Sequence, residues 1–587
     1  MSIEREARVD VNRRKALKLG AGALAAPYVI TPRKGLAQVA PVIPPSPPTQ
    51  AWAEEIKWPR SKEPVSTLWP TPMGQANTSG GENFPGGECG RGQHQAWDRF
   101  GDNTLLYEMR VREASHRLNA AYPSSNIWGF DSQYPGPVFR NFYRRPVLVR
   151  IHNELNPDYV GFGTPEISTH LHNMHTPSAS DGFPGDFFGP AKFGPTLTAP
   201  GQFRDHFYPM VYAGCTDPQY AATDGDPREA LGTLWYHDHC MDFTAANVVR
   251  GLAGFHIMYD ELDSNDENDT NPAALRLPSG EFDMPLMFQD LRIDPNTYQV
   301  VFDQLSPEGV VGDKIPVNGI IEPFMKVARR KYRLRLLNGG PSRNYEFYLV
   351  TATNAIQTFT YIANDGNLLP APLLNRKNVR LGVAERGDIV VDFSKYPLGT
   401  ELYLINRLRQ TDTRKPDEDL LSTSTAPKLL KFIIDREPPE ADNSRVPSVL
   451  RALPNLPDLS RLRTRSWTFK RENGVWTVNG RLFDVHRVSA QIPKGSAEIW
   501  NLHNGGGGWL HPVHIHFEEG RILRKWVEGK EVPVPDHERG RKDVYVLGPN
   551  DSVRLVMRFR DFPGKFPTHC HNVYHEDHAM MFRWDIV

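Results

Sequence analysis

Short apolar runs separated by Gly, Pro and Asn recur along most of this chain. In the first half, residues 147–151 (VLVRI) and 254–259 (GFHIMY) are examples, and both are rich in β-branched or aromatic side chains. Such runs, when turn-forming residues bound them, are typical of strands. From about residue 52 to residue 262, the pattern therefore predicts an antiparallel β-sandwich.

The same pattern continues through the middle of the chain, over residues 283–436. Residues 331–337 (KYRLRLL) alternate charged and apolar positions, which predicts a half-buried strand, and residues 389–393 (IVVDF) predict a core strand. The acidic segment 261–269 precedes this region and is expected to be a solvated domain boundary. We therefore predict a second β domain.

A third strand-rich region ends the chain, over residues 465–587. Residues 497–502 (AEIWNL) and 553–559 (VRLVMRF) each predict a strand. Residues 437–464 are charged and rich in proline, and we expect them to form a linker on the surface. The pattern as a whole predicts an all-β protein of three domains.

The charge balance narrows the possible partners. With 68 basic and 69 acidic residues among 587, the formal net charge is −1, which predicts no nucleic-acid partner. No stretch approaches the roughly 20 apolar residues of a membrane-spanning helix. We therefore expect no membrane span, and the function must be inferred from motifs.

The N-terminus has the pattern of a targeting segment. Arg13 and Arg14 precede an apolar run, residues 16–30, that Lys18 interrupts. A twin-arginine pair before a weakly hydrophobic core is the bacterial signature for export of folded protein. A basic, disordered tail is the alternative interpretation.

Export would make residues 1–37 a twin-arginine signal peptide. The small residues at 35–37 suit cleavage, so the mature protein would begin near Gln38 with a Pro-rich leader over residues 38–51. The expected location is then periplasmic or secreted, where the oxidising compartment permits a disulfide.

Histidines gather in four short clusters, which hold ten of the 20 in the chain. Core or surface histidines could give one such cluster, but they are a poor explanation for four. The clusters are His170-x-His172, His237-x-His239, His511-x-x-His514-x-His516, and His569-Cys570-His571 followed by His575 and Met580.

The last cluster predicts two metal centres at once. On a strand, side chains alternate between faces, so His569 and His571 would point one way and Cys570 the other. Cysteine, two histidines and a distant methionine are the ligands of a blue electron-transfer copper. His575 and Met580 supply two of these ligands, and the other histidine must come from elsewhere.

The four clusters resemble those of the multicopper oxidases, in the same order along the chain. The likeness is to three-domain bacterial laccases of the spore-coat type and to bilirubin oxidases. It is carried by residues 170–182, 234–239, 511–516 and 569–581, and it is weakest in the second domain. The resemblance implies three cupredoxin-like, Greek-key β-sandwich domains.

The resemblance also implies four copper ions and their ligands. The type 1 copper would be held by His511, Cys570, His575 and axial Met580; the type 2 copper by His170 and His514; and the type 3 pair by His172, His237, His239, His516, His569 and His571. All ligands come from the first and third domains, so the second would be a spacer.

The implied activity couples one-electron oxidation of phenolic or aromatic donors at the type 1 copper to four-electron reduction of O2 to water at the trinuclear cluster. Oxidation of Cu(I) or Mn(II) is the alternative, although the 13 scattered Met residues do not form the Met-rich insert of copper-efflux oxidases. A copper-free structural relative is a third, weaker reading of the family. We expect a monomer whose partners are O2 and a small-molecule or metal-ion donor.

Two carboxylates match positions that lie near the oxygen site in this family. Asp181 and Glu576 are predicted to deliver protons and to tune the cluster. Alternatively, Asp181-Gly182 is a simple turn and Glu576 caps a helical turn.

Two further histidines and the remaining cysteines complete the set of expectations. His175 would be a group beside the ligands or a surface residue, and His578 a non-ligand. Cys89 and Cys215 are the preferred disulfide pair, and Cys240 is expected to be buried and inert.

Overall fold

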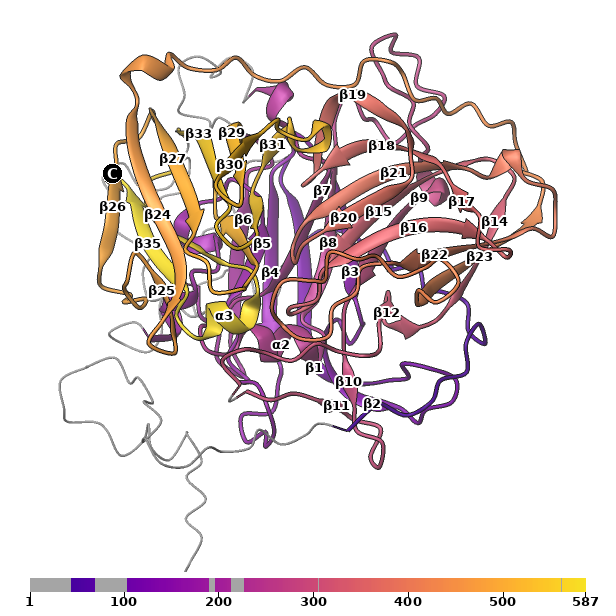
Figure 1. Ribbon diagram of the computed structural model, residues 1–587, viewed down its shortest axis with the longest axis horizontal. Coiled ribbons are helices and arrows are strands. Elements are labelled where there is room, and N and C mark those ends of the chain that lie inside the picture. The colour runs from indigo at the N-terminus through magenta and orange to yellow at the C-terminus, as the bar shows by residue number, and fades with distance from the viewer. Residues whose placement is uncertain (1–43, 69–102, 189–195, 213–225, 305, 561) are drawn as a thin grey trace, which may run out of the picture. The chain divides into compact units, whose positions relative to one another are not determined.

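The computed structural model describes residues 44–68, 103–188, 196–212, 226–304, 306–560 and 562–587. The predicted signal peptide, the first part of the leader (residues 38–43), Cys89 and Cys215 lie outside these residues, so the predictions that rest on them remain untested. Strands dominate, and the α-helices among the described residues are the short α2 (Thr244–Arg250) and α3 (Val573–Asp577), which contact each other (Figure 1).

The first β-sandwich is formed by two four-stranded sheets, ordered β2-β1-β4-β6 and β3-β8-β7-β5. Its pairing is mixed, because β1 pairs with β4 and β3 with β8 in parallel, which corrects the expectation of a purely antiparallel sandwich. The strands are β1 (Leu105–His116), β2 (Ser125–Phe130), β3 (Gly136–Phe142), β4 (Val147–Asn153), β5 (Thr169–His172), β6 (Phe203–Tyr208), β7 (Thr233–Asp238) and β8 (Ala253–Tyr259).

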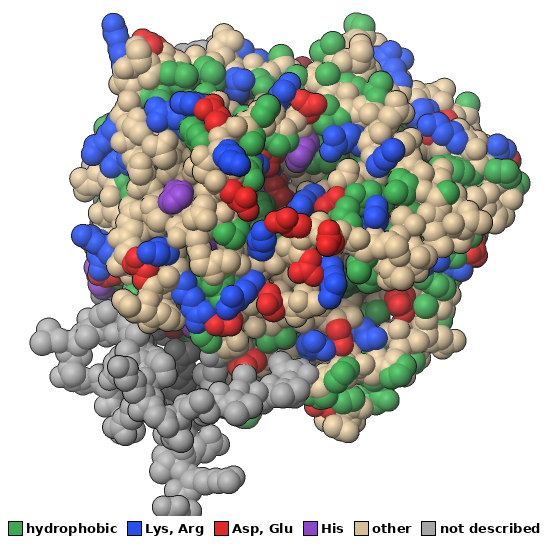
Figure 2. All heavy atoms as spheres, viewed as in Figure 1, with side chains coloured by type: hydrophobic (Ala, Val, Ile, Leu, Met, Phe, Trp, Pro, Cys, Tyr) green, Lys and Arg blue, Asp and Glu red, His purple; other side chains and the backbone are tan. Residues whose placement is uncertain are grey.

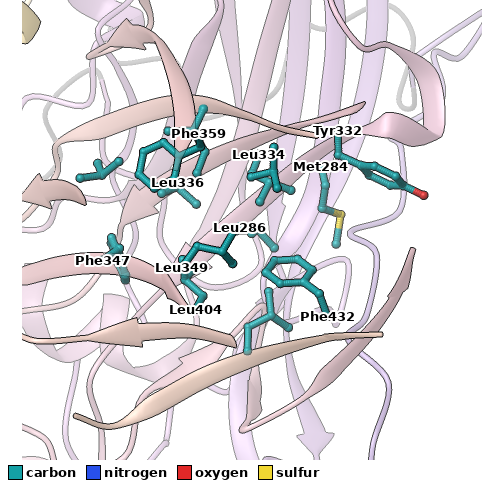
Figure 3. Close-up of a cluster of buried hydrophobic side chains, with 14 of the residues drawn as sticks. Met284, Leu286, Tyr332, Leu334, Leu336, Phe347, Leu349, Phe359, Leu404 and Phe432 are labelled. Atoms are coloured by element: carbon teal, nitrogen blue, oxygen red, sulfur yellow. The ribbon is translucent and has the colours of Figure 1, made fainter. Parts of the chain in front are cut away.

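The second sandwich lies to the right in Figure 1, with sheets ordered β13-β12-β9-β15-β21-β18-β19 and β14-β23-β22-β16-β17, the latter joined by β20. Leu286, Leu334, Phe347 and Phe432 point into the core that both sheets share (Figure 3). The strands are β9 (Asp283–Phe288), β12 (Pro316–Val317), β13 (Ile320–Ile321), β14 (Phe324–Ala328), β15 (Lys331–Asn338), β16 (Tyr345–Thr351), β17 (Ile356–Gln357), β18 (Phe359–Asn364), β19 (Asn367–Arg376), β20 (Asn378–Leu381), β21 (Arg386–Asp392), β22 (Glu401–Asn406) and β23 (Lys428–Arg436); β10 (Arg292–Ile293) and β11 (Val300–Val301) form a separate hairpin.

The third sandwich lies to the left in Figure 1, with sheets ordered β25-β24-β27-β33-β29-β30, joined by β31, and β26-β35-β34-β28-β32. Its core includes Cys570 and Met580 beside Trp500 and Phe566. The strands are β24 (Arg463–Glu472), β25 (Val475–Val478), β26 (Val488–Ile492), β27 (Ser496–Asn504), β28 (His511–Ile515), β29 (Gly520–Val527), β30 (Lys530–Val532), β31 (Arg541–Lys542), β32 (Val544–Leu547), β33 (Ser552–Phe559), β34 (Gly564–Cys570) and β35 (Met581–Ile586).

The strand expected to be half-buried is in fact buried along almost its whole length. On β15, Arg333 and Arg335 are 1% and 0% exposed. Arg335 pairs with Asp283, and Arg333 pairs with Asp388 and with Asp263. The alternation of charge along this strand therefore marks a buried ionic layer, because each guanidinium is matched by carboxylates.

The acidic boundary segment is also less solvated than expected. Asp263 and Glu267 are 5% and 7% exposed, and Glu267 pairs with Arg330 as Asp263 does with Arg333. Charge runs are therefore a poor guide to exposure in this chain.

The surface of the molecule mixes both signs of charge, as its net charge suggests. Figure 2 shows Lys and Arg side chains interspersed with Asp and Glu across one face, and few histidines reach it. Among the described residues, no helix has the length and apolar character needed to span a membrane.

Candidate metal centres

Two pairs of adjacent strands carry the histidine clusters. In the first sandwich, β5 pairs with β7 so that His170 lies opposite His237. In the third, β28 pairs with β34 so that His514 lies opposite His569. Neighbouring strands therefore place imidazoles from distant parts of the sequence side by side.

The side chains at the end of β34 alternate as predicted. Nε2 of His569 lies 3.1 Å from Nε2 of His239 in the first sandwich. Sγ of Cys570 lies on the other side, 3.5 Å from Nδ1 of His511 and 3.6 Å from Nδ1 of His575. One strand end thus contributes to two separate groups of metal-binding atoms.

We call the first group the sulfur centre, formed by His511, Cys570, His575 and Met580. All four residues are buried, and the donor atoms of the first three lie within 4.8 Å of one another. Met580 belongs to the same core cluster as Cys570 and accepts a backbone hydrogen bond from it at 3.0 Å. Trp476 covers the centre by stacking on His575, with ring centroids 3.7 Å apart.

The burial of the sulfur centre suits a metal cation. Burial lowers the pKa of His511 to about 3, so its ring is neutral and can bind a metal. Burial also raises the pKa of the Cys570 thiol, which disfavours a free thiolate in this apolar core. A bound metal ion would reverse that preference by stabilising the thiolate directly.

The second group, which we call the histidine centre, lies between the first and third sandwiches. Its closest set is His239, His516 and His569, whose Nε2 atoms are 3.1 to 3.2 Å apart. The centre is completely buried, with members 0% to 1% exposed. Its members are His170, His172, His237, His239, His514, His516, His569 and His571.

Hydrogen bonds fix which nitrogen faces inward. His170 donates from Nδ1 to the backbone oxygen of Asp181 at 2.5 Å, and His516 donates from Nδ1 to the Asp181 carboxylate at 2.8 Å. His237 and His569 donate from Nδ1 to the backbone oxygens of the residues that follow them. These bonds select the tautomer in which Nε2 carries the free lone pair.

The remaining nitrogens fit a metal-binding role. A buried polar atom without a partner is costly, and proteins rarely leave one so. Among the described residues, several imidazole nitrogens of this centre have no hydrogen-bond partner: Nε2 of His170, His237 and His514, Nδ1 of His172, and both nitrogens of His571. Neutral imidazoles are good ligands for copper, and so the donor set fits that metal.

The two carboxylates singled out in the sequence both border the histidine centre. Asp181 is fully buried, and its Oδ1 lies 3.5 Å from Nδ1 of His170. Glu576, on α3, lies 3.6 Å from Nδ1 of His239. Burial, together with the neighbouring Asp577, raises the pKa of Glu576 well above its usual value, which favours the protonated form of this carboxyl.

The other singled-out residues have simpler outcomes. His175 is not a surface residue: it is fully buried, 3.3 Å from the Glu519 carboxylate. His578 donates from Nδ1 to the Tyr574 oxygen at 2.7 Å. Cys240 is buried as expected, and burial raises the pKa of its thiol, which agrees with an inert role.

Sequence patterns gave no indication of one carboxylate at the histidine centre. Asp543, between β31 and β32, is fully buried and accepts from Nε2 of His172 at 2.5 Å and from Nδ1 of His514. Burial would raise its pKa, but the adjacent Arg386 guanidinium outweighs this and holds the pKa below its usual value. A lone aspartate within a charged stretch carries no motif, so only the fold reveals it.

Cupredoxin-like sandwiches that enclose a cysteine-histidine group and a larger histidine group define a class of oxidoreductase, and comparisons with known proteins agree. The family model described as multicopper oxidase matches residues 452–587. A bilirubin oxidase from Albifimbria verrucaria is 33% identical over 489 residues, which cover 82% of this chain and 76% of that protein. A laccase from Bacillus subtilis is 28% identical over 526 residues, covering 82% of this chain and 94% of the laccase.

Solved structures show the same fold. The crystal structure of a laccase from Pediococcus acidilactici has a TM-score of 0.68 at 23% identity and covers 92% of this chain and 95% of its own. The chain belongs to the multicopper oxidase family. It is therefore a laccase-like oxidoreductase that uses copper, with small-molecule donors and oxygen as acceptor.

Proposed function

We propose that this protein is an exported oxidase that binds four copper ions and couples oxidation of phenolic or other aromatic donors to reduction of O2 to water. The sulfur centre would hold the type 1 ion. In the histidine centre, His170 and His514 would hold the type 2 ion, and the other six histidines the type 3 pair. The single observation that carries the proposal is Cys570 lying between His569 and His571 but facing the other centre.

Bound copper would supply the one-electron redox steps and the oxygen-binding centre, neither of which side chains alone provide. The protein's part is to hold neutral imidazoles in fixed tautomers and to keep the site dry. Burial of the histidines and the hydrogen bonds to Asp181 support this. The backbone from Cys570 to His569 and His571 makes the shortest covalent connection between the two centres.

Proton supply to oxygen would fall to Glu576 and Asp181. Burial and Asp577 raise the pKa of Glu576, which favours its protonated form, and this carboxyl lies beside His239. Asp181, which follows β5 in the first sandwich, contacts His170 and His516. Their positions support delivery of protons to the space that the histidines enclose.

Aromatic donors suit the surroundings of the sulfur centre better than metal ions do. Trp476 and Trp509 both make ring contacts with His575. The guanidinium of Arg471 lies 5.1 Å from the Trp476 ring and forms an ion pair with Glu308. Both indole rings are buried, so the partly exposed guanidinium of Arg471 above them is the group that offers an aromatic donor a stacking surface, whereas Mn(II) prefers free carboxylates.

The direct test is copper content combined with colour and oxygen uptake. The purified protein should contain about four copper ions, show an intense blue charge-transfer band, and consume O2 with phenols or bilirubin faster than with Cu(I) or Mn(II). A protein that stays colourless after copper loading would overturn the oxidase. Higher rates with Cu(I) or Mn(II) would instead show that the donor is a metal ion and not an aromatic compound.

Export has its own test. We expect the protein from the periplasm or medium to begin near Gln38, with the Arg13-Arg14 segment removed. An intact N-terminus on the native protein would contradict the twin-arginine route.

A further inference from the structure

One side chain of the second sandwich, Arg386, approaches the histidine centre through a buried carboxylate. This residue begins β21 and is fully buried. Its guanidinium forms a two-pronged pair with Asp543, with Nη1 3.1 Å from Oδ2 and Nη2 2.8 Å from Oδ1. Asp543 in turn accepts from His172 and His514, so Arg386 is one residue removed from two imidazoles of the centre.

The other N–H groups of this guanidinium are also committed. Nε donates to the backbone oxygen of Thr233 on β7 of the first sandwich at 3.2 Å. Nη1 and Nη2 each donate at 3.0 Å to backbone oxygens of the second sandwich, those of Ala384 and Asp365. With Asp543 in the third sandwich, one planar group joins all three sandwiches, and its fork geometry fixes the carboxylate in place.

The carboxylate selects opposite tautomers on two neighbouring rings. His172 donates from Nε2, which leaves Nδ1 as the nitrogen with a free lone pair. His514 donates from Nδ1, which leaves Nε2 free. The two rings stack with centroids 3.7 Å apart and planes 12° apart, so a wrong tautomer in either would turn an N–H toward the metal-binding space.

The two histidines do not depend equally on the Asp543 carboxylate. His514 has a second acceptor for Nδ1, the backbone oxygen of Asp543 at 3.2 Å. For His172, the Asp543 carboxylate is the hydrogen-bond partner recorded for Nε2 among the described residues. His172 should therefore be the more sensitive of the two to any shift of the carboxylate.

We propose that Arg386 is a positioning residue of the histidine centre, which acts through Asp543 to fix the Nδ1-free tautomer of His172 and so makes copper binding there depend on the docking of the second sandwich. The second sandwich is then more than a spacer. This inference rests on the proposed function for the identity of the metal, but the tautomer of His172 can be measured without any metal.

The test uses the full chain with Arg386→Gln, Arg386→Lys and a matched control, Arg333→Gln. Arg333 is also buried and paired with aspartates, namely Asp388, Asp263 and, at 4.0 Å, Asp283, and its ion pairs involve none of the histidines of either centre. Each variant is loaded with copper, and three quantities are measured: copper bound per chain, the blue band of the sulfur centre, and the electron paramagnetic resonance of the type 2 ion. In the copper-free proteins, ring nitrogen shifts in ¹⁵N NMR report the His172 tautomer, assigned by His172→Gln.

We expect Arg386→Gln to keep the blue band but to lose roughly 10–100-fold in copper affinity at the histidine centre. The His172 Nδ1-free tautomer should no longer dominate in the copper-free variant. Arg386→Lys should recover part of the affinity, because it restores the charge but not the fork. Arg333→Gln should leave both copper binding and tautomer unchanged, even where its stability falls.

Three results would overturn the inference: full copper affinity and an unchanged tautomer in Arg386→Gln, an equal loss in Arg333→Gln, or a protonated Nδ1 on His172 in the copper-free wild type. The last needs no variant of Arg386, so it can overturn the inference even if Arg386→Gln does not fold. A wild type without copper or blue colour would refute the proposed function instead, while leaving the tautomer measurement valid.

Discussion

The two metal centres differ in how much of the protein must assemble before they exist. The sulfur centre takes all its groups from the third sandwich, on β28, β34 and the segment that follows through α3. The histidine centre takes its groups from two sandwiches and has hydrogen bonds that reach a third. The sulfur centre therefore needs only the third sandwich to be folded, whereas the histidine centre also needs the sandwiches to be correctly docked.

The largest effect should come from removing the Cys570 sulfur, which belongs to the sulfur centre and not to the histidine centre. Cys570→Ser removes the thiolate, so we expect complete loss of the blue band and of turnover, with copper at the histidine centre retained. Absorption spectra and copper analysis check this. Cys240→Ser is the control, because Cys240 is equally buried but its sulfur lies 3.4 Å from the Glu166 backbone oxygen. A blue Cys570→Ser protein would place the type 1 site elsewhere.

Weakening the contact between the first and third sandwiches should affect copper binding at the histidine centre but not at the sulfur centre. Glu229 is fully buried in the first sandwich and pairs with Arg558 and Arg560 of the third. Glu229→Gln removes the charge of the buried carboxylate that both guanidinium groups contact, at a cost of about 3–5 kcal/mol in unfolding free energy.

On titration with a chelator, that variant should lose copper from the histidine centre while the blue band persists. Glu267→Gln breaks a buried pair with Arg330 and serves as the control. Loss of both centres together in Glu229→Gln would mean that the sulfur centre also depends on docking.

The two centres should differ in the pH dependence of their half-reactions, because only oxygen reduction needs protons. Because the pKa of Glu576 is raised, its protonated form persists to higher pH than that of an ordinary carboxyl, and the proton is lost only as the pH rises through the raised value. Glu576→Gln cannot transfer the proton, so oxygen reduction should slow by roughly 10²–10⁴-fold, and its decline at high pH should disappear.

Stopped-flow measurement of each half-reaction checks this. Reduction of the sulfur centre by the donor should keep its wild-type rate in the variant. Equal slowing of both half-reactions would show that Glu576 is structural.

The smallest effect should follow from Met580→Leu. Met580 is buried in the third-sandwich core, and Leu is of similar volume, so the fold and the copper content should be unchanged. Loss of a weak axial sulfur should raise the potential of the sulfur centre and change the donor oxidation rate by less than about tenfold. Redox titration of the blue band measures this, and an unchanged potential would exclude Met580 as the axial group.

Much of the site was predictable because its chemistry requires unusual residue spacing. The His-x-His pairs and the embedded Cys570 are rare patterns, and strand alternation alone placed Cys570 opposite His569. The sequence pattern also located strands such as β4 and β27 correctly. Local periodicity needs only a few neighbouring residues to be visible.

What could not be predicted depends on contacts between distant segments. Asp543 and Arg386 are 157 positions apart, and neither lies in a recognisable motif. The pattern predicted that Arg333 and Arg335 face solvent, because periodicity cannot show that aspartates on other strands pair with them in the core. The parallel pairs in the first sandwich likewise depend on chain topology.

The position of Cys570 between two histidines has a consequence for durability. Because His569, Cys570 and His571 are consecutive, the spacing between the two ligand sets is set by peptide bonds and cannot widen when domains loosen. Heat or mild denaturant should thus release copper from the histidine centre before the covalent connection between the two centres changes length. An ageing preparation would then turn over slowly while still looking blue.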